Sequence, residues 1–108
     1  MKKPPYLYVF VRKDLSIQDQ MCQACHAAQI SGAEYGCPED CHIVVLQVTN
    51  EEELLVTSLI CNKAKIKYII FDEQCNGDDE NLGFTAISTE PITQVKRQYF
   101  SKYKLWSH

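Results

Sequence analysis

The chain has 108 residues, of which 45% are hydrophobic and 23% are charged. This composition suits one globular domain with one core, spanning residues 1–108, and argues against a disordered chain. The formal net charge of −3 argues against a uniformly basic nucleic-acid-binding surface, although lysines and arginines cluster near both ends of the sequence.

The first half of the chain begins with a strand pattern followed by a helix pattern. Residues 7–11 form a short apolar run rich in β-branched and aromatic side chains, which predicts a buried strand. Ser16 and Asp19 form a start similar to a capping box, and Gly32 and Gly36 end the helix or follow its end. Apolar residues at helical spacing predict the buried face. They are Ile17, Met21, Ala24, Cys25 and Ala28.

The same alternation continues with a second strand and a second helix. Residues 42–48 are apolar and predict a strand. Asn50 is a good N-cap, and three glutamates follow it in the first turn, where the helix dipole favours acids. The face expected to pack on the sheet consists of Leu54, Leu55 and Leu59.

The last third of the chain predicts two more strands and a final helix. Residues 67–71 and 83–88 are the strands, separated by a polar, acidic loop at 74–81. Pro91 suits the first turn of a helix, and the aromatic tail at 103–106 is expected to dock on the domain. One face of that helix would carry Ile92, Val95 and Tyr99.

No segment has the pattern of a membrane span or of a leader. The longest apolar runs, such as residues 7–11 and 43–46, fall far short of the roughly 18 apolar residues that a span requires. The early lysines are followed by Pro4, Pro5 and an apolar run that Arg12 ends, which is not a signal-peptide pattern. We therefore expect a cytoplasmic protein without membrane contacts, whose six cysteines are free thiols or metal ligands.

Four segments, in this order along the chain, resemble the type 2 peptidyl-tRNA hydrolase family. They are LYVFVRKDLSIQDQMCQACHAA at 7–28, NEEEL at 50–54, IIFD at 69–72 and TAISTEP at 85–91, so the resemblance covers roughly residues 6–91. The element order β-α-β-α-β-β-α implies right-handed crossovers and a mainly parallel sheet, but it does not fix the pairing of the last two strands. The resemblance implies an α/β fold with a four-stranded mixed sheet, its last strand antiparallel, and helices on both faces.

The family hydrolyses the ester between a peptide and its tRNA, and the resemblance implies where that chemistry would lie. Asp72 would orient or activate the attacking water, and Thr85 would hold that water or the ester carbonyl. The positions matching the substrate-binding region are Arg12, Lys13, Asp14, Gln23 and His26. A structural interpretation stays open for three of these positions: Asp72 as a turn cap, Thr85 as a plain strand residue and His26 as a packed helix residue.

Two departures from the family leave the activity open. The lysine-rich start of the family's first helix is replaced by IQDQ at 17–20, and its Ala-Gly-Arg-Thr-Gln loop is replaced by EQCNGDDE at 73–80. The first change removes a positive charge that would stabilise an oxyanion, and the second adds acids that repel phosphate. The alternatives are a hydrolase that takes a lysine from elsewhere, or a catalytically silent protein that binds a nucleotide-like ligand or a protein partner. No cofactor is expected in either case, and the edge strand and aromatic tail favour a homodimer.

The cysteines and the acidic loop raise three metal alternatives to the expectation that no metal is bound. Cys22, Cys25, Cys37 and Cys41 form two pairs with acceptable spacing for tetrahedral zinc. Cys22, Cys25 and His26 also match the haem-attachment pattern, but no export signal accompanies it. A calcium loop beginning at Asp72 would lack its bidentate glutamate, because the twelfth position is Gly83.

Overall fold

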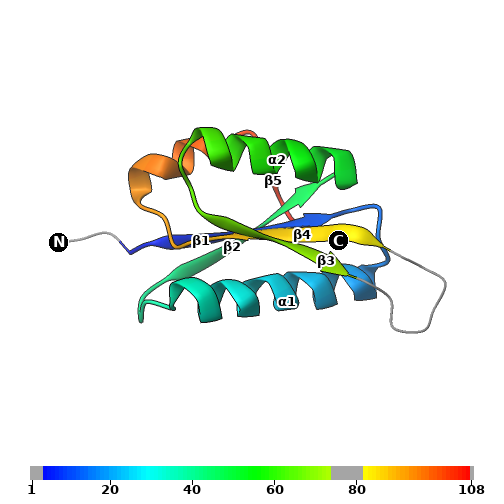
Figure 1. Ribbon diagram of the computed structural model, residues 1–108, viewed down its shortest axis with the longest axis horizontal. Helices are drawn as coiled ribbons and strands as arrows, with labels where there is room; N and C mark the ends of the chain where they lie inside the picture. The colour runs from blue at the N-terminus through cyan, green and yellow to red at the C-terminus, as the bar shows by residue number, and fades with distance from the viewer. Residues whose placement is uncertain (1–3, 74–81, 108) are drawn as a thin grey trace.

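The computed structural model describes residues 4–73 and 82–107. The elements, in chain order, are β1 (Tyr6–Arg12), α1 (Ile17–Tyr35), β2 (His42–Val48), α2 (Glu51–Lys63), β3 (Tyr68–Glu73), β4 (Gly83–Thr89), the 3-10 helix η1 (Gln94–Phe100) and β5 (Lys104–Leu105). Figure 1 shows the sheet as the middle layer, with α1 on one face and α2 on the other. The expected α/β class is confirmed, and the sheet has five strands rather than four.

The strand order across the sheet is β3-β4-β1-β2-β5. β1 and β2 are parallel from Tyr6 opposite His42 to Arg12 opposite Val48, and the other three pairings are antiparallel. The carboxyl ends of β1 and β2 therefore lie side by side, which is where open α/β sheets usually bind ligands.

The fifth strand comes from the aromatic tail. Leu105 lies opposite Leu46 of β2, and the backbone N–H of Trp106 donates to the carbonyl of Val45 at 2.9 Å. The prediction that the tail docks is confirmed, and its docking corrects the predicted strand count. Two paired residues are too short for a strand pattern in the sequence, so only the tertiary contact defines β5.

A β-bulge interrupts the pairing of β3 with β4. Phe71 lies opposite Ala86 and Asp72 lies opposite Phe84, so Thr85 is an extra residue of β4. A bulge turns the side chains around it and often marks a position where a strand redirects one of them. Thr85 and Ala86 accordingly both face α1, where Thr85 bonds to Gln23 and Ala86 packs against Ala27.

Helix α1 begins at the predicted cap but buries a different face from the predicted one. Ser16 accepts a hydrogen bond from the backbone N–H of Asp19, which confirms the cap. The buried residues are Gln20, Gln23, Ala27 and Ser31, whereas the predicted stripe is half-buried at Ala24 and Ala28 and exposed at Ile17, Met21 and Cys25. The buried polar side chains are accommodated because they are hydrogen-bonded, as Ser31 is to the carbonyl of Thr89 at 2.6 Å.

For the other two helices, the predicted positions are right, but the faces predicted to be buried are partly wrong. Asn50 caps α2 through the backbone N–H of Glu53, as predicted. Leu54 is buried, but Leu55 and Leu59 are 41% and 64% exposed, and their places in the core are taken by Thr57 and Cys61. The final helix is a 3-10 helix in which Val95 and Tyr99 are exposed and Phe100 is buried, while Ile92 is buried just before the helix begins.

Candidate functional site

Thr85 and Gln23 are brought together between β4 and α1, but both side chains are buried. Thr85 is fully buried and Gln23 is 3% exposed. The Thr85 hydroxyl donates to Gln23 Oε1 at 3.0 Å and lies 3.4 Å from the carbonyl oxygen of Phe71. This hydroxyl has its partners within the protein, so in this arrangement it does not present itself to a bound ester.

Asp72 lies on the other side of the sheet from the Thr85 hydroxyl. Ile70 and Phe84 pack on the core beneath α2, and Asp72 lies opposite Phe84 in the antiparallel register. Directly opposed side chains of an antiparallel pair share a face, so the exposed side chain of Asp72 is on the α2 face. The residues expected to form a catalytic pair are close along the backbone but do not converge on one site.

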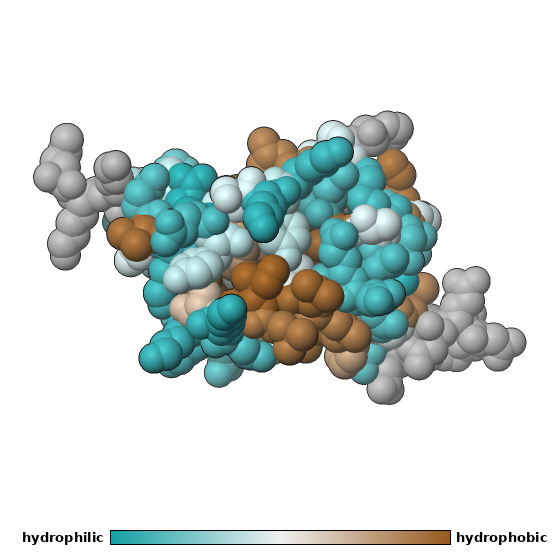
Figure 2. All heavy atoms as spheres, turned by 90° about the horizontal axis from the view of Figure 1, so that it is seen from above, coloured by the Kyte–Doolittle hydropathy of each residue, from teal (hydrophilic) through white to brown (hydrophobic). Residues whose placement is uncertain are grey.

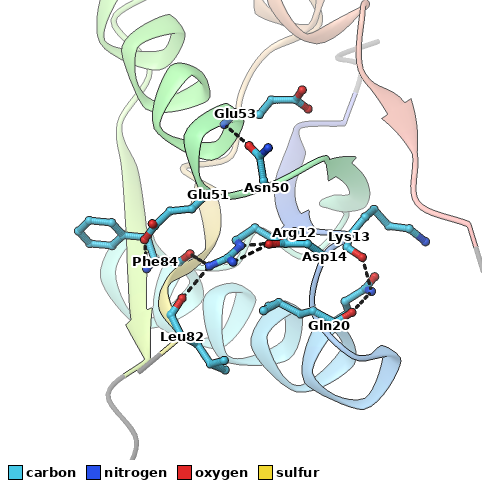
Figure 3. A network of polar contacts seen from close by, with 10 residues as sticks. Arg12, Lys13, Asp14, Gln20, Asn50, Glu51, Glu53, Leu82 and Phe84 are labelled. Atoms are coloured by element: carbon cyan, nitrogen blue, oxygen red, sulfur yellow. Dashed lines mark hydrogen bonds and ion pairs between the residues drawn. The ribbon is translucent and has the colours of Figure 1, made fainter. Parts of the chain in front are cut away.

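Arg12 and Asp14 are brought together as an ion pair at the end of β1 (Figure 3). The guanidinium of Arg12 donates to the Asp14 carboxylate at 2.9 Å and 2.7 Å, and to the carbonyls of Leu82 and Phe84 at 2.6 Å and 2.9 Å. The backbone N–H of Phe84 in turn donates to Glu51 Oε2 at 2.9 Å. Arg12 therefore ties the end of β1 to the start of β4, and β4 is held to the first turn of α2.

The electrostatics of this pair follow from its geometry. The hydrogen bonds from Arg12 hold the pKa of the Asp14 carboxyl below its usual value, and the bond to Asp14 raises the pKa of Arg12. The Arg12 side chain is only 11% exposed and its donors already have acceptors. Both residues therefore connect parts of the fold, and Arg12 has few free donors with which to bind a phosphate.

Lys13 is held by the C-terminal tail. Its ammonium group lies 5.0 Å from the centroid of the Trp106 ring and donates to the carbonyl of Ser107. Gln20 fixes the same region, because its Oε1 accepts from Trp106 Nε1 at 2.7 Å and its Nε2 donates to the carbonyl of Leu15 at 2.7 Å. The tail thereby holds the positive charge of Lys13 beside the carboxyl end of β1.

His26 lies on α1 beside β3. Its ring meets the Phe71 ring edge-on with centroids 5.2 Å apart, and Nε2 lies 3.8 Å from the sulfur of Cys22. The histidine is exposed, but it packs on a strand residue. The sheet separates it from a groove on the α2 side of the molecule. Of the predicted substrate-binding residues, only Lys13 lines that groove.

The four cysteines of the zinc alternative do not come together. Cys22 and Cys25 are exposed on α1, while Cys37 and Cys41 follow its far end. The ten residues of helix between Cys25 and Tyr35 alone span about 15 Å at a rise of 1.5 Å each. Among residues 4–73 and 82–107, no three His, Cys, Asp or Glu side chains are grouped to hold a metal ion. Most of the calcium-loop alternative falls at 74–81, outside the described residues.

A groove of about 800 Å³ lies between α2, η1 and the carboxyl ends of β1 and β2. Its cationic and aromatic lining residues are Lys13, Lys102, Lys104, Tyr99 and Tyr103. Glu53 also lines it, but its carboxylate accepts from the backbone N–H of Thr49 at 3.1 Å. The Tyr103 hydroxyl is hydrogen-bonded to Thr57 at 2.7 Å, and burial raises the Tyr103 pKa.

Sequence reasoning missed this groove as a site. The sequence shows the late basic cluster and the aromatic tail as separate features. Only the folded chain brings them to the carboxyl end of β1. The signal that could have located the groove is the alternation of Lys and Tyr at 102–104, directly after a predicted helix.

Comparison with known proteins bears on the fold alone. No family model matches the chain, and no curated protein matches its sequence. Its fold is similar to a solved structure of a protein of unknown function from Agrobacterium tumefaciens strain C58, with a TM-score of 0.74, 13% identity and coverage of 97% of this chain and 99% of that one. In the part of the chain that the structure describes, α1 and the other helices are too short or too polar to cross a membrane.

Proposed function

We propose that this chain is a catalytically silent binding protein that holds an anionic, ring-bearing small ligand, of the nucleotide type, in the groove between α2, η1 and β5. The observation that carries the proposal is the convergence of three lysines and two tyrosines on that groove. They are gathered at the carboxyl ends of two parallel strands in a chain whose net charge is −3.

The chemistry of the lining residues sets the class of ligand. Lysine ammonium groups are mobile point charges that bind phosphate, and Lys102 and Lys104 are exposed and line the groove. Tyr99 is 46% exposed and offers an aromatic surface on which a base can stack. The groove has both the charge and the apolar surface that a nucleotide requires, and its volume is within the range of ordinary ligand sites.

The burial of Thr85 favours binding over hydrolysis. A hydrolase of the resembled family would need Thr85 and Asp72 at one site together with a positive charge. Thr85 is instead buried against Gln23, Asp72 is on the opposite face, and the start of α1 carries Asp19 and no lysine. Peptidyl-tRNA hydrolysis stays a prediction, to be tested with an N-blocked aminoacyl-tRNA and the variant Asp72→Asn.

Binding is tested by titration with AMP, ATP and inorganic phosphate. Trp106 is the only tryptophan and lies beside Lys13, so its fluorescence reports on the groove. We expect AMP and ATP to change this fluorescence at lower concentrations than phosphate, and added salt to weaken the effect. The double variant Lys102→Gln/Lys104→Gln should weaken ATP binding by about tenfold or more, whereas the matched variant Lys63→Gln/Lys67→Gln, outside the groove, should not.

Two outcomes would remove the proposal. One is a protein whose fluorescence and amide NMR spectrum do not respond to any of the three probes at millimolar concentration. The other is turnover of the N-blocked aminoacyl-tRNA that is lost in Asp72→Asn, because it would establish the hydrolase and place the site at β3.

A further inference from the structure

β3 forms one end of the sheet, and no strand among residues 4–73 and 82–107 pairs with its outer edge. The backbone of Lys67, just before β3, faces β4, because its carbonyl accepts from the N–H of Glu90 at 2.8 Å and its N–H donates to the Glu90 carboxylate. Backbone groups alternate in direction along a strand. Tyr68, Ile70 and Asp72 therefore direct their N–H and C=O groups away from β4, toward the open edge.

An apolar flank of α2 accompanies this edge. Leu55 and Leu59 are 41% and 64% exposed, one helical turn apart. Glu51, one turn before Leu55, bonds to Phe84 of β4, and Asn62 lines a pocket together with Tyr68. Leu55 therefore lies on the flank of α2 nearer β3, whereas Leu59, one turn further on, is directed away from the sheet. Figure 2, which is seen from above Figure 1 and so from the α2 side, shows apolar side chains gathered near the middle of the view. Ile70, which is partly buried, continues the apolar surface onto the sheet.

The two edges of the sheet differ in how they are protected. β5 has two exposed residues, one of which is Lys104, and short, charged edge strands resist pairing. β3 has six residues, YIIFDE, with neither proline nor lysine among them. A strand of this length and composition is a template for another strand unless something covers it.

We propose that the strand that covers β3 is β3 of a second copy, paired antiparallel about a two-fold axis that passes at Ile70. This register sets Ile70 opposite Ile70 of the partner subunit, and Tyr68 opposite Asp72 of the partner subunit. Tyr68, Ile70 and Asp72, whose backbone groups point outward, then pair with the same three residues of the partner subunit. The two five-stranded sheets become one, and α2 of both copies lies on the same face.

Two features favour a second copy over an unrelated strand. Lys65 and Lys67 precede β3 and Asp72 lies near its end, so antiparallel pairing sets the basic start of each strand near the acidic end of the other. The two-fold axis also turns the flank of α2 that carries Leu55 toward the partner subunit. Such an interface is isologous and closes at the dimer.

The test is the oligomeric state in solution, measured by sedimentation velocity from micromolar to millimolar concentration. We expect a species with the mass of two 12.4 kDa chains that dissociates on dilution. Leu55→Lys should weaken association by about tenfold or more, because it adds a positive charge from each copy beside the interface. Val95→Lys is the matched control, since Val95 is 73% exposed on η1, across α2 from the edge.

A second variant addresses the strand pairing itself. Ile70→Pro removes an outward N–H and leaves the hydrogen bonds to β4 in place, so it should give a folded monomer, with circular dichroism as the check on folding. A wild-type protein that is monomeric at every concentration would overturn the proposal. So would a dimer whose dissociation is unchanged by Leu55→Lys, a result that does not depend on how Ile70→Pro folds.

Discussion

Thr85 of β4 donates its hydroxyl proton to Gln23 of α1 across 3.0 Å, in a layer where both side chains are buried. The bulge at Thr85 makes this contact, because the extra residue turns the side chain toward α1. A residue that the sequence offers as catalytic is therefore part of the contact that fixes the helix on the sheet.

Replacement of the Thr85 hydroxyl should destabilise the fold. Thr85→Val keeps the shape but leaves Gln23 Oε1 without this donor in a buried position, and we expect a loss of about 1–3 kcal/mol of unfolding free energy in urea. Thr85→Ser keeps the hydroxyl and should cost less. Thr93→Val, at an exposed position, is the control and should have little effect. Equal stability of the Val and Ser variants would show that the hydrogen bond contributes nothing.

The ion pair between Arg12 and Asp14 should make stability depend on pH. The folded pKa of Asp14 is lowered by the hydrogen bonds from Arg12, so the pair stabilises the protein above the ordinary aspartate pKa. This contribution is lost as pH falls through the lowered folded value. Asp14→Asn should be less stable at pH 7 by about 1 kcal/mol or less, since the pair is partly exposed.

The check is a pair of urea titrations, at pH 7 and in strong acid. The difference between wild type and Asp14→Asn should shrink as the wild-type carboxylate is protonated. Glu39→Gln serves as the control, because Glu39 is exposed in a turn and has no ion pair to a described residue. A difference that is the same at both pH values would mean that the charge on Asp14 is not what stabilises the fold.

Gly83 should not tolerate a side chain. Its φ is +70°, and a Cβ at this position would collide with Glu51 Oε2, the acceptor for the Phe84 N–H. Gly83→Ala should therefore lower the unfolding free energy by about 1–3 kcal/mol. Gly32 has open space around its Cβ position and lies within α1, so Gly32→Ala should raise the unfolding free energy by about 0.5–1 kcal/mol. Opposite signs for the two variants in thermal unfolding are the expected result.

Cys61 should be protected from thiol reagents in the folded protein. It is fully buried on the sheet-facing side of α2, and burial raises its pKa to about 12. Cys22, Cys25 and Cys37 are exposed and should be alkylated first. Mass spectrometry after brief iodoacetamide treatment at pH 8 should find Cys61 unmodified until urea is added. Modification of Cys61 at the rate of Cys22 would contradict its burial.

Local sequence patterns were enough to predict the class of fold and the start of both α-helices. The strand at His42–Val48 and the caps Ser16 and Asn50 lie where local patterns predict them. These features can be predicted locally. An N-cap bonds to a backbone N–H two or three residues away, and a strand is favoured by a run of adjacent β-branched residues.

The tertiary structure decided which faces are buried and which residues share a site. Gln23 is buried because Thr85, 62 residues away, supplies its partner, and Leu55 is exposed because α2 turns Leu54 and Cys61 toward the sheet instead. Lys13 and Lys102 line one groove because the tail adds β5 beside β2. Burial and convergence depend on partners that are distant in the sequence, and a periodic pattern of hydropathy does not contain them.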